Sequence, residues 1–310
     1  MTVPPLAPEW CTYVNATCTV EGTLYGYRPN LGANVFFAVI FGLCGLIQLG
    51  LGIRYRTWTF MIALTLGCLG EVIGYAGRLI MNNNPYDENG FTTQICCLII
   101  SPAFIAAGVY LTLKHLVLTF GEEWSRLRAP LYTYIFISCD IVSLVLQGAG
   151  GGIASTADEG SSAQDAGTNL MIAGVIFQVV VLVFFAGFVI DYFIRTRNRR
   201  SQLSASAIQL SHSTRFRVFL GAIVLAYLGI LIRCAYRIPE LTEGWGSELM
   251  RNEVDFIVLE GAMVVISVLA LTICHPGYCF PALANTIGSK KRRNGEKSME
   301  SSDEGSGVAV

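Results

Sequence analysis

The sequence predicts an all-α polytopic membrane protein, a bundle of seven transmembrane helices with its N-terminus outside the cell and its C-terminus in the cytosol. Composition is the first reason, because 53% of the 310 residues are hydrophobic and only 14% are charged, whereas soluble domains carry about 25% charged residues. The second reason is seven apolar stretches, each long enough to supply the roughly 20 helical residues that cross a bilayer core. The third is that lysine and arginine gather on one side of these stretches.

The seven expected spans are separated by loops with turn chemistry, such as Asn82-Asn83-Asn84-Pro85. Residues 1–30 are expected to form an extracellular segment, 31–281 the transmembrane domain and 282–310 a disordered cytosolic tail. The first segment has neither a basic start nor an apolar core, so no cleavable signal peptide is expected. The loop Gln202–Ser213, rich in serine and alanine, is also expected to be disordered. The predicted spans are Leu31–Ile53, Trp58–Met81, Gln94–Leu118, Leu131–Ile153, Asn169–Ile194, Arg217–Arg237 and Val254–His275.

The orientation follows from the basic residues. Sixteen of the 21 lysine and arginine residues lie on one side of the predicted spans, in the segments that follow spans one, three and five, at the span ends that border those segments, and in the tail. Basic loops stay in the cytosol. Asn15 begins the glycosylation sequon Asn15-Ala16-Thr17, which can be used only if the N-terminus is outside. Cys11 and Cys18 flank it and are expected to form a disulfide there, although either could instead pair with Cys96 or Cys97 at the outer end of the third span.

Charged side chains inside the spans are the main candidates for function, because a charge within a bilayer is costly. The helical rise of about 1.5 Å per residue places most of them in the outer part of the membrane, whereas Asp140 approaches the midplane. Ser143 and Gln147 share a helix face with Asp140. This layer of charged side chains in the outer part of the membrane is explained either by ion-pair clamps between helices or by a ligand cavity. Arg237, at the end of a span, is expected to snorkel toward the interface. The charged set is Glu71, Arg78, Asp140, Arg233, Arg237 and Glu260.

Two backbone features are expected to disturb the helices. Four glycines within Gly148–Gly152 should loosen the outer end of the fourth span, either freeing carbonyl groups into a cavity or ending the helix. Pro102 in the third span should kink that helix and leave a carbonyl group without its usual partner, because proline has no backbone N–H.

Ordered motifs on separate spans complete the pattern. They are Glu71-Val72-Ile73-Gly74-Tyr75-Ala76-Gly77-Arg78, Ser101-Pro102-Ala103 with Ala106, Ala107 and Tyr110, Asp140-Ile141-Val142-Ser143 through Gln147 and the glycine run, Gly174 with Gln178, Arg233-Cys234-Ala235-Tyr236-Arg237, Glu260, and His275-Pro276-Gly277. With them the chain, from about Tyr25 to Pro281, resembles the fungal RTA-like proteins, also called lipid-translocating exporters. The resemblance implies a fungal source, seven spans and a link to export of sphingoid long-chain bases and to resistance to toxic lipophilic compounds.

The resemblance implies a transporter that moves sphingoid bases or lipophilic toxic compounds toward the outer leaflet, in the plasma membrane or in another secretory or endosomal membrane. The expected partners are membrane lipids and an amphiphilic substrate, with no nucleic acid. Glu71 and Glu260 are the first choices for the substrate amine, and Asp140 is a deeper waypoint. Ser143 or Gln147 would bind hydroxyl groups. The remaining candidates, which could meet a phosphate head group or tune the acids, are Arg78, Arg233, Tyr236 and Arg237.

The main rival is a seven-helix receptor or sensor of lipid or drug stress, since an outer N-terminus with seven spans is also a receptor topology. The third span ends in Lys114-His115 and the seventh in His275-Pro276-Gly277, which lack the usual receptor motifs. An enzyme is not expected, because a metal hydrolase needs clustered histidine ligands and the three histidines are scattered. No metal, haem or other cofactor and no ATP-binding motif is expected.

Overall fold

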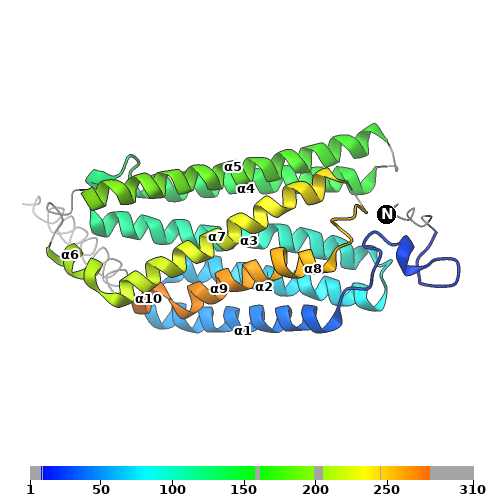
Figure 1. Ribbon diagram of the computed structural model, residues 1–310, viewed down its shortest axis with the longest axis horizontal. Helices are drawn as coiled ribbons and strands as arrows, with labels where there is room; N and C mark the ends of the chain where they lie inside the picture. The colour runs from blue at the N-terminus through cyan, green and yellow to red at the C-terminus, as the bar shows by residue number, and fades with distance from the viewer. Residues whose placement is uncertain (1–7, 9, 158–160, 199–204, 245, 280–310) are drawn as a thin grey trace, which may run out of the picture.

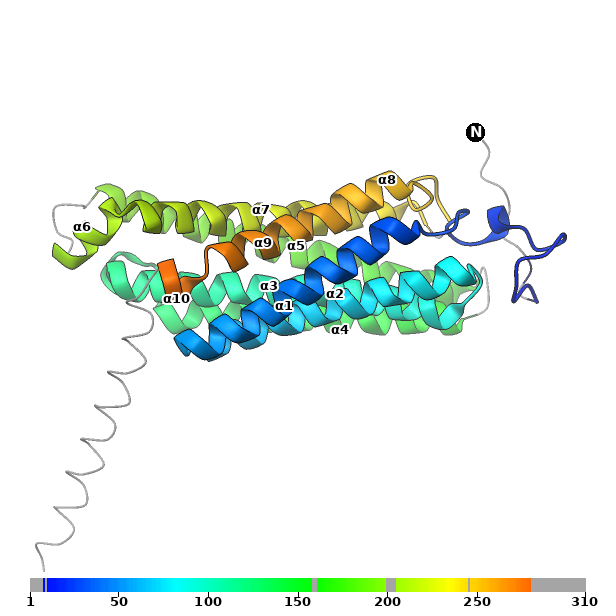
Figure 2. The same cartoon turned by 90° about the horizontal axis from the view of Figure 1, so that it is seen from below.

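The computed structural model describes residues 8, 10–157, 161–198, 205–244 and 246–279, and these form helices with no strand. Within them, seven helices are long and apolar enough to cross a membrane, as predicted. They pack side by side as an antiparallel bundle (Figures 1 and 2). The first six spans are α1 (Leu31–Tyr55), α2 (Trp58–Asn83), α3 (Glu88–Phe120), α4 (Ala129–Thr156), α5 (Ser162–Asn198) and α7 (Thr214–Thr242).

The seventh span is built from four consecutive pieces. They are α8 (Glu253–Asp255), the π-helix η4 (Phe256–Ala262), α9 (Met263–Ile273) and α10 (Pro276–Cys279). Short helices lie in the connections: η1 (Val20–Gly22), η2 (Glu122–Trp124) and α6 (Ala205–His212). The start of α8 and the N-terminal segment share one end of the bundle, called here the N-terminal end. Helices α6 and α10 lie at the other, the α6 end (Figure 1).

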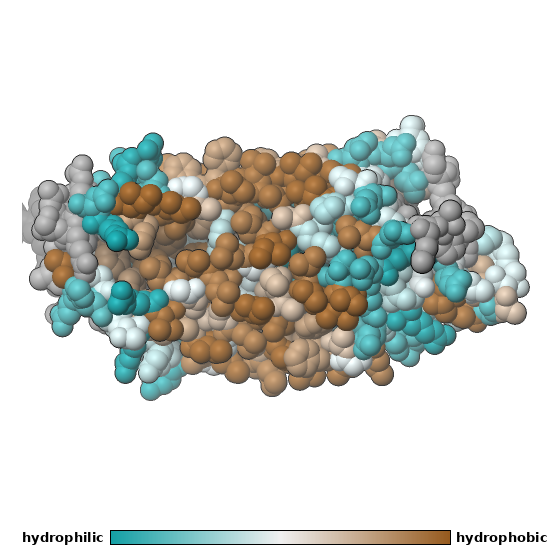
Figure 3. All heavy atoms as spheres, in the orientation of Figure 1, coloured by the Kyte–Doolittle hydropathy of each residue, from teal (hydrophilic) through white to brown (hydrophobic). Residues whose placement is uncertain are grey.

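The outer surface of the bundle is suited to lipid. A broad hydrophobic band surrounds its middle and hydrophilic residues gather toward both ends (Figure 3). Large apolar side chains such as Leu46, Val145 and Phe184 are more than 60% exposed. An apolar surface of this extent would be unfavourable in water, whereas a bilayer accepts it. The protein is therefore a multi-pass membrane protein.

Several helices extend beyond the predicted spans, because polar residues continue them past the apolar region. Helix α3 begins at Glu88 rather than near residue 94, since the Asp87 carboxylate accepts a hydrogen bond from the Gly90 amide (2.6 Å), a typical N-cap. Helix α7 continues past Arg237 to Thr242. The predicted loop Gln202–Ser213 contains the helix α6, so the disorder expected for residues 205–212 was wrong. The predicted tail 282–310 lies outside the described residues.

The expectation that Gly148–Gly152 would loosen or end the fourth span was also wrong, because α4 remains helical to Thr156. The reason is packing against α5. A Cβ atom at Gly150 would lie 2.6 Å from the Gly167 carbonyl oxygen and 2.5 Å from the Met171 nitrogen. Close contact between the two backbones thus outweighs the low helix propensity of glycine.

The N-terminal segment covers the N-terminal end of the bundle. Cys11 and Cys18 form a disulfide, and Cys96 and Cys97 are free thiols. Asn15 is exposed within the disulfide loop, where its side-chain oxygen accepts hydrogen bonds from the amides of two following residues. Hydrogen bonds attach the segment to the loop between α2 and α3: the Asn84 amide donates to the Thr12 carbonyl (2.9 Å) and the Tyr86 hydroxyl to the Thr19 carbonyl (2.6 Å).

Candidate functional site

Four charged side chains form a buried ion-pair clamp between α7 and η4. Glu260 Oε1 accepts hydrogen bonds from Arg233 (2.7 Å) and Arg237 (3.0 Å), and Arg237 also donates to Glu240 (3.0 Å). Each of the four is at most 4% exposed. Burial of charges is tolerated only with such pairing, so this clamp, defined as Arg233, Arg237, Glu240 and Glu260, ties the sixth span to the seventh.

The prediction that Arg237 snorkels to the interface was wrong. Helix α7 continues one turn beyond it, and Glu240 and Glu260 provide partners for its guanidinium inside the bundle. These two acidic partners compensate the buried guanidinium charge through charge-assisted hydrogen bonds. Glu240 was not among the sequence candidates, because it lies beyond the predicted end of the span. Its spacing of three residues from Arg237 was the signal that could have found it.

The π-helical turn η4 positions Glu260. A π-helix within a longer helix widens one turn and often marks a functional position. Gly261, next to Glu260, faces the rings of Phe37 in α1 and Tyr75 in α2, and a side chain there would clash with both. Further along the same span, the Ser267 hydroxyl of α9 donates to the Ala226 carbonyl of α7 (2.9 Å). Gly261 thus allows η4 to pack closely on α1 and α2, and Ser267 ties α9 to α7 about two turns from the clamp.

Pro102 supplies a second partner for Arg233. In a regular helix the amide of residue 102 would bond the Leu98 carbonyl, but proline has no N–H. Arg233 Nη2 donates to this Leu98 carbonyl instead. The backbone acceptor that Pro102 leaves open in α3 thus joins the clamp, so α3, α7 and η4 meet at one polar point.

Glu71 lies near the clamp but outside its ion pairs. It is 2% exposed in α2, within electrostatic range of Arg233, Glu260 and Arg237. Glycines on the same helix let α2 approach α3 closely: a Cβ at Gly74 would lie 2.6 Å from the Leu98 side chain. Among the described residues, none forms an ion pair with Glu71. Tyr236 is likewise buried beside the clamp, within electrostatic range of Glu240 and Glu260.

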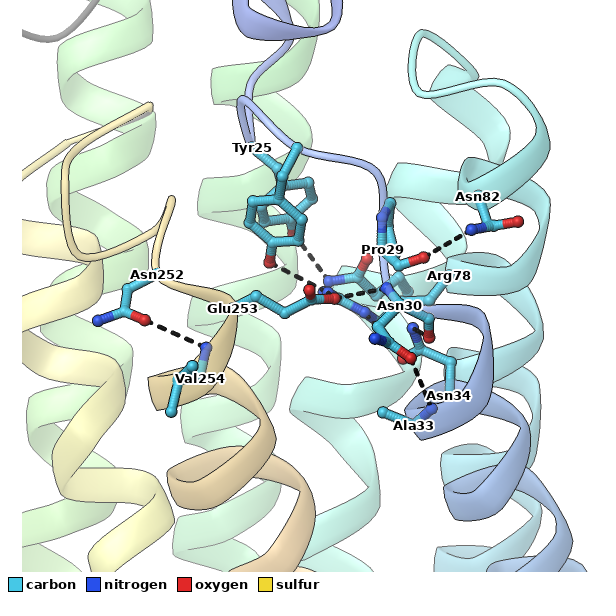
Figure 4. A network of polar contacts seen from close by, with 12 residues as sticks. Tyr25, Pro29, Asn30, Ala33, Asn34, Arg78, Asn82, Asn252, Glu253 and Val254 are labelled. Atoms are coloured by element: carbon cyan, nitrogen blue, oxygen red, sulfur yellow. Dashed lines mark hydrogen bonds and ion pairs between the residues drawn. The ribbon is translucent and has the colours of Figure 1, made fainter.

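Arg78 is completely buried at the N-terminal end, where Figure 4 shows it among side chains from three segments. Its guanidinium donates to Asn34 Oδ1 (3.0 Å) and to the Tyr27 hydroxyl (3.1 Å), and lies 3.8 Å from Glu253 Oε1. It also stacks 3.8 Å from the centre of the Phe256 ring, a favourable cation–π contact. Burial raises the pKa of the Tyr27 hydroxyl, so it stays neutral. Arg78 therefore anchors the N-terminal segment and α8 to α1 and α2.

Asp140 is in a different situation. It is 4% exposed in α4, and neither carboxylate oxygen has a hydrogen-bond partner among the described residues. The Tyr110 hydroxyl of α3 lies beside this carboxyl group, close enough to act as its hydrogen-bond donor although the contact departs from ideal geometry. Of the residues on the same face, Ser143 donates to the Asp140 backbone carbonyl (2.7 Å) and Gln147 donates to Gln178 of α5 (3.1 Å).

Comparison with known proteins gives the family. The family described as RTA1 like protein matches residues 64–283, from α2 to beyond α10. The chain belongs to this RTA1-like family. The match includes all nine predicted substrate-binding residues, and Asn15, Cys11 and Cys18 lie outside it.

Three relatives of this RTA1-like protein come from Saccharomyces cerevisiae. The sphingoid long-chain base transporter RSB1 is 33% identical over 296 residues, which cover 86% of this chain and 77% of RSB1. Protein RTA1 is 26% identical, covering 82% of this chain and 84% of its own, and protein RTM1 is 24% identical, covering 82% and 91%. No solved structure matches.

Taken together, the nine candidates of the RTA1-like chain fall into three groups. Arg233, Arg237 and Glu260 meet in the clamp, with Glu71 and Tyr236 beside it. Arg78 belongs to the network under the N-terminal segment. Asp140, Ser143 and Gln147 lie on α4, apart from both. Among the described residues, no group of three or more histidine, cysteine, aspartate or glutamate side chains is placed to hold a metal ion.

Proposed function

We propose that this protein moves long-chain amines of the sphingoid-base type across the membrane. Family membership and the relative named as a sphingoid long-chain base transporter support the substrate class. The observation that carries the proposal is Asp140, a buried carboxyl group inside a span that has no cationic partner among the described residues and only the Tyr110 hydroxyl beside it. A buried carboxylate without a cation is unfavourable, and the ammonium group of a substrate would supply that cation.

Asp140 therefore becomes the first choice for the amine, ahead of Glu260. Glu260 already accepts two charge-assisted hydrogen bonds from arginines, so a substrate amine would have to displace one of them. Glu71 remains a second candidate, because it has no ion pair within the described residues. Gln147 lies one turn beyond Ser143 on α4, and its side-chain amide donates to Gln178 of α5. These two amides are the groups that we propose bind the hydroxyl groups of the substrate.

We further propose that transport runs toward the outer leaflet of the plasma membrane, with the N-terminal end of the bundle outside. The basic residues at the α6 end support this orientation, as does the exposed sequon asparagine in a disulfide-closed loop. The alternative function, a sensor that regulates lipid export without carrying lipid, is an outcome of the test below.

The test is Asp140→Asn, followed in two assays at matched expression: release of long-chain bases from cells, and movement of a fluorescent long-chain base across liposomes that contain the purified protein. Loss of a charge-assisted hydrogen bond to the substrate costs about 1.5–3 kcal/mol, so both rates should fall about tenfold or more. Asp191→Asn is the matched control, because this carboxylate pairs with Arg126 and Arg195 at the exposed end of α5.

The two assays separate the alternatives. Wild-type protein that leaves liposome rates at the protein-free level, while cells respond normally, would favour the sensor. Equal rates for Asp140→Asn and wild type in liposomes would remove Asp140 from the amine site and leave Glu71→Gln as the next variant to measure.

A further inference from the structure

A cavity of about 580 Å³ lies between α3, α5 and α7, within the usual size of small-molecule sites. Helix α7 crosses the bundle diagonally and diverges from α5 toward the α6 end (Figure 1). The recess is on the face seen in Figure 3, and its walls are mainly hydrophobic, including Leu113, Phe193 and Leu220. The cavity therefore suits an alkyl chain.

The two ends of the cavity differ in character. At the α6 end it is lined by Thr196, Arg197, Ser211 and Arg217. Both arginines are exposed, and no acidic residue in the described part of the chain pairs with them. The opposite, inner end is lined by aromatic rings, not by charges. An ammonium head group would be repelled from the arginine end, so an amine in this cavity must point its head inward.

Phe185 and Tyr227 close the inner end. Their ring centres are 5.6 Å apart, and Phe185 packs 4.5 Å from Tyr110. The Tyr227 hydroxyl donates to the Leu182 carbonyl and so ties α7 to α5. Asp140 lies behind this layer on α4, one turn beyond Phe136, whose ring packs 5.0 Å from Phe185 and 5.6 Å from Tyr110. Phe185 and Tyr227, with Tyr110 behind Phe185, thus separate a chain-sized apolar cavity from a carboxyl group that has no cationic partner among the described residues.

We infer that the cavity between α5 and α7 is the side entrance through which a long-chain amine reaches Asp140, with Phe185 and Tyr227 as its gate. The alkyl chain occupies the cavity, and the ammonium group passes the two rings to pair with Asp140. This inference rests on the proposed function, and it adds the route, the orientation of the substrate and two gating residues.

Packing supports a gate at this place. Helices α4 and α5 touch backbone to backbone at Gly150 and Gly167, whereas the cavity separates α5 from α7 toward the α6 end, so the seam between α5 and α7 is the looser one. One side-chain hydrogen bond, from Tyr227, crosses the seam at the level of the gate. Opening requires that bond to break and the Phe185 ring to turn, with no ion pair lost.

The experiment uses the full-length protein in lipid nanodiscs and two photoreactive long-chain 2-amino alcohols, one with a diazirine at the end of the alkyl chain and one with a diazirine beside the amine. After illumination, labelled peptides are mapped by mass spectrometry. The chain-end probe should label α5 and α7 along the cavity. The amine-end probe should label α4 around Asp140, and Phe185→Ala should increase that labelling several-fold.

Leu220→Trp, which fills the cavity, should reduce chain-end labelling at least fivefold. Val218→Trp is the matched control, because this residue lies on the same helix, is 56% exposed and does not line the cavity. A long-chain amine should compete with the probe, and an alkyl phosphate of equal length should not.

Three results would overturn the inference: chain-end label on other helices, equal effects of Leu220→Trp and Val218→Trp, or amine-end label at the Arg197 and Arg217 end with competition by the phosphate. The last would make the cavity a site for an anionic lipid. Failure here is distinct from failure of the proposed function. If the chain-end probe labels residues outside the cavity while Asp140→Asn is inactive in transport, the entrance is refuted and the proposed function stands. If the probe labels the cavity while Asp140→Asn transports normally, Asp140 is refuted as the amine site.

Discussion

Replacing Glu260 with glutamine would remove the acid that Arg233 and Arg237 share. The two hydrogen bonds to its Oε1 measure 2.7 and 3.0 Å, and both arginines are at most 4% exposed. Breaking a buried ion pair from one side costs about 3–5 kcal/mol, because it leaves an uncompensated charge. Arg237 keeps Glu240 at 3.0 Å and Arg233 keeps the Leu98 carbonyl, so the lower value, about 3 kcal/mol, is expected for Glu260→Gln.

The assay is the fraction of detergent-solubilised protein that survives heating, measured by size-exclusion chromatography. About 3 kcal/mol corresponds to a fall of about 6 °C in the midpoint for a chain of this size. Arg126→Gln is the control, since its side chain is 58% exposed and pairs with Asp191 at 2.9 Å. Such a pair contributes about 1 kcal/mol or less, so its midpoint should fall by about 2 °C at most.

The double variant Arg233→Gln with Glu260→Gln sharpens the test. It removes one charge of each sign and leaves Arg237 paired with Glu240, so it should be more stable than the sum of the single changes predicts, by about 2 kcal/mol. A midpoint for Glu260→Gln within 1 °C of wild type, or strictly additive effects in the double variant, would refute the clamp as a coupled unit.

Three further predictions concern the rest of the chain. Gly150→Ala forces a methyl group against the α5 backbone and should lower the midpoint by several degrees, whereas Gly152→Ala, whose Cβ would meet open space, should preserve or raise it; equal effects would contradict the close contact. Asn15→Gln should abolish a glycosidase-sensitive gel shift, and a wild-type protein without that shift would contradict the predicted glycosylation. Tyr86→Phe removes the hydrogen bond to Thr19, so the N-terminal segment should be cleaved faster in limited proteolysis, and unchanged cleavage would mean that this bond does not restrain it.

The seven spans could be predicted because apolar length is a strong signal and each span must satisfy its own backbone. The candidate site was harder to predict from the sequence. Residue spacing shows which charged side chains share a face of one helix, but it does not show which helices contact each other. Arg233 and Arg237 share a face by their spacing of four. Their common partner, Glu260, depends on the π-helix η4, whose wider turn changes the face that the following residues present. Nothing in the apolar pattern of the seventh span signals this turn.

For Pro102, the sequence predicted that a backbone carbonyl would be left open but did not predict which residue would bind it. The missing N–H and the carbonyl left open follow from proline chemistry alone. The open carbonyl belongs to Leu98. Arg233, 135 residues further along the chain, donates a hydrogen bond to it, and this contact depends on how α3 and α7 pack. The prediction for Gly148–Gly152 was wrong because it also depended on packing. The low helix propensity of glycine indicated a loose helix end, but contact with α5 keeps α4 helical to Thr156.

The two groups of buried charge divide the bundle in a way that bears on movement. Arg233 bonds α7 to α3 and η4, and Arg78 bonds α2 to α1 and the N-terminal segment. Helices α4 and α5 take no part in these pairs, and glycine contacts such as Gly150 with Gly167 hold them to each other. The charged contacts therefore stabilise one part of the bundle as a fixed frame. Asp140 lies where the α4–α5 pair meets that frame, so a tilt of the pair would change the surroundings of this carboxyl group while every ion pair of the clamp stays intact.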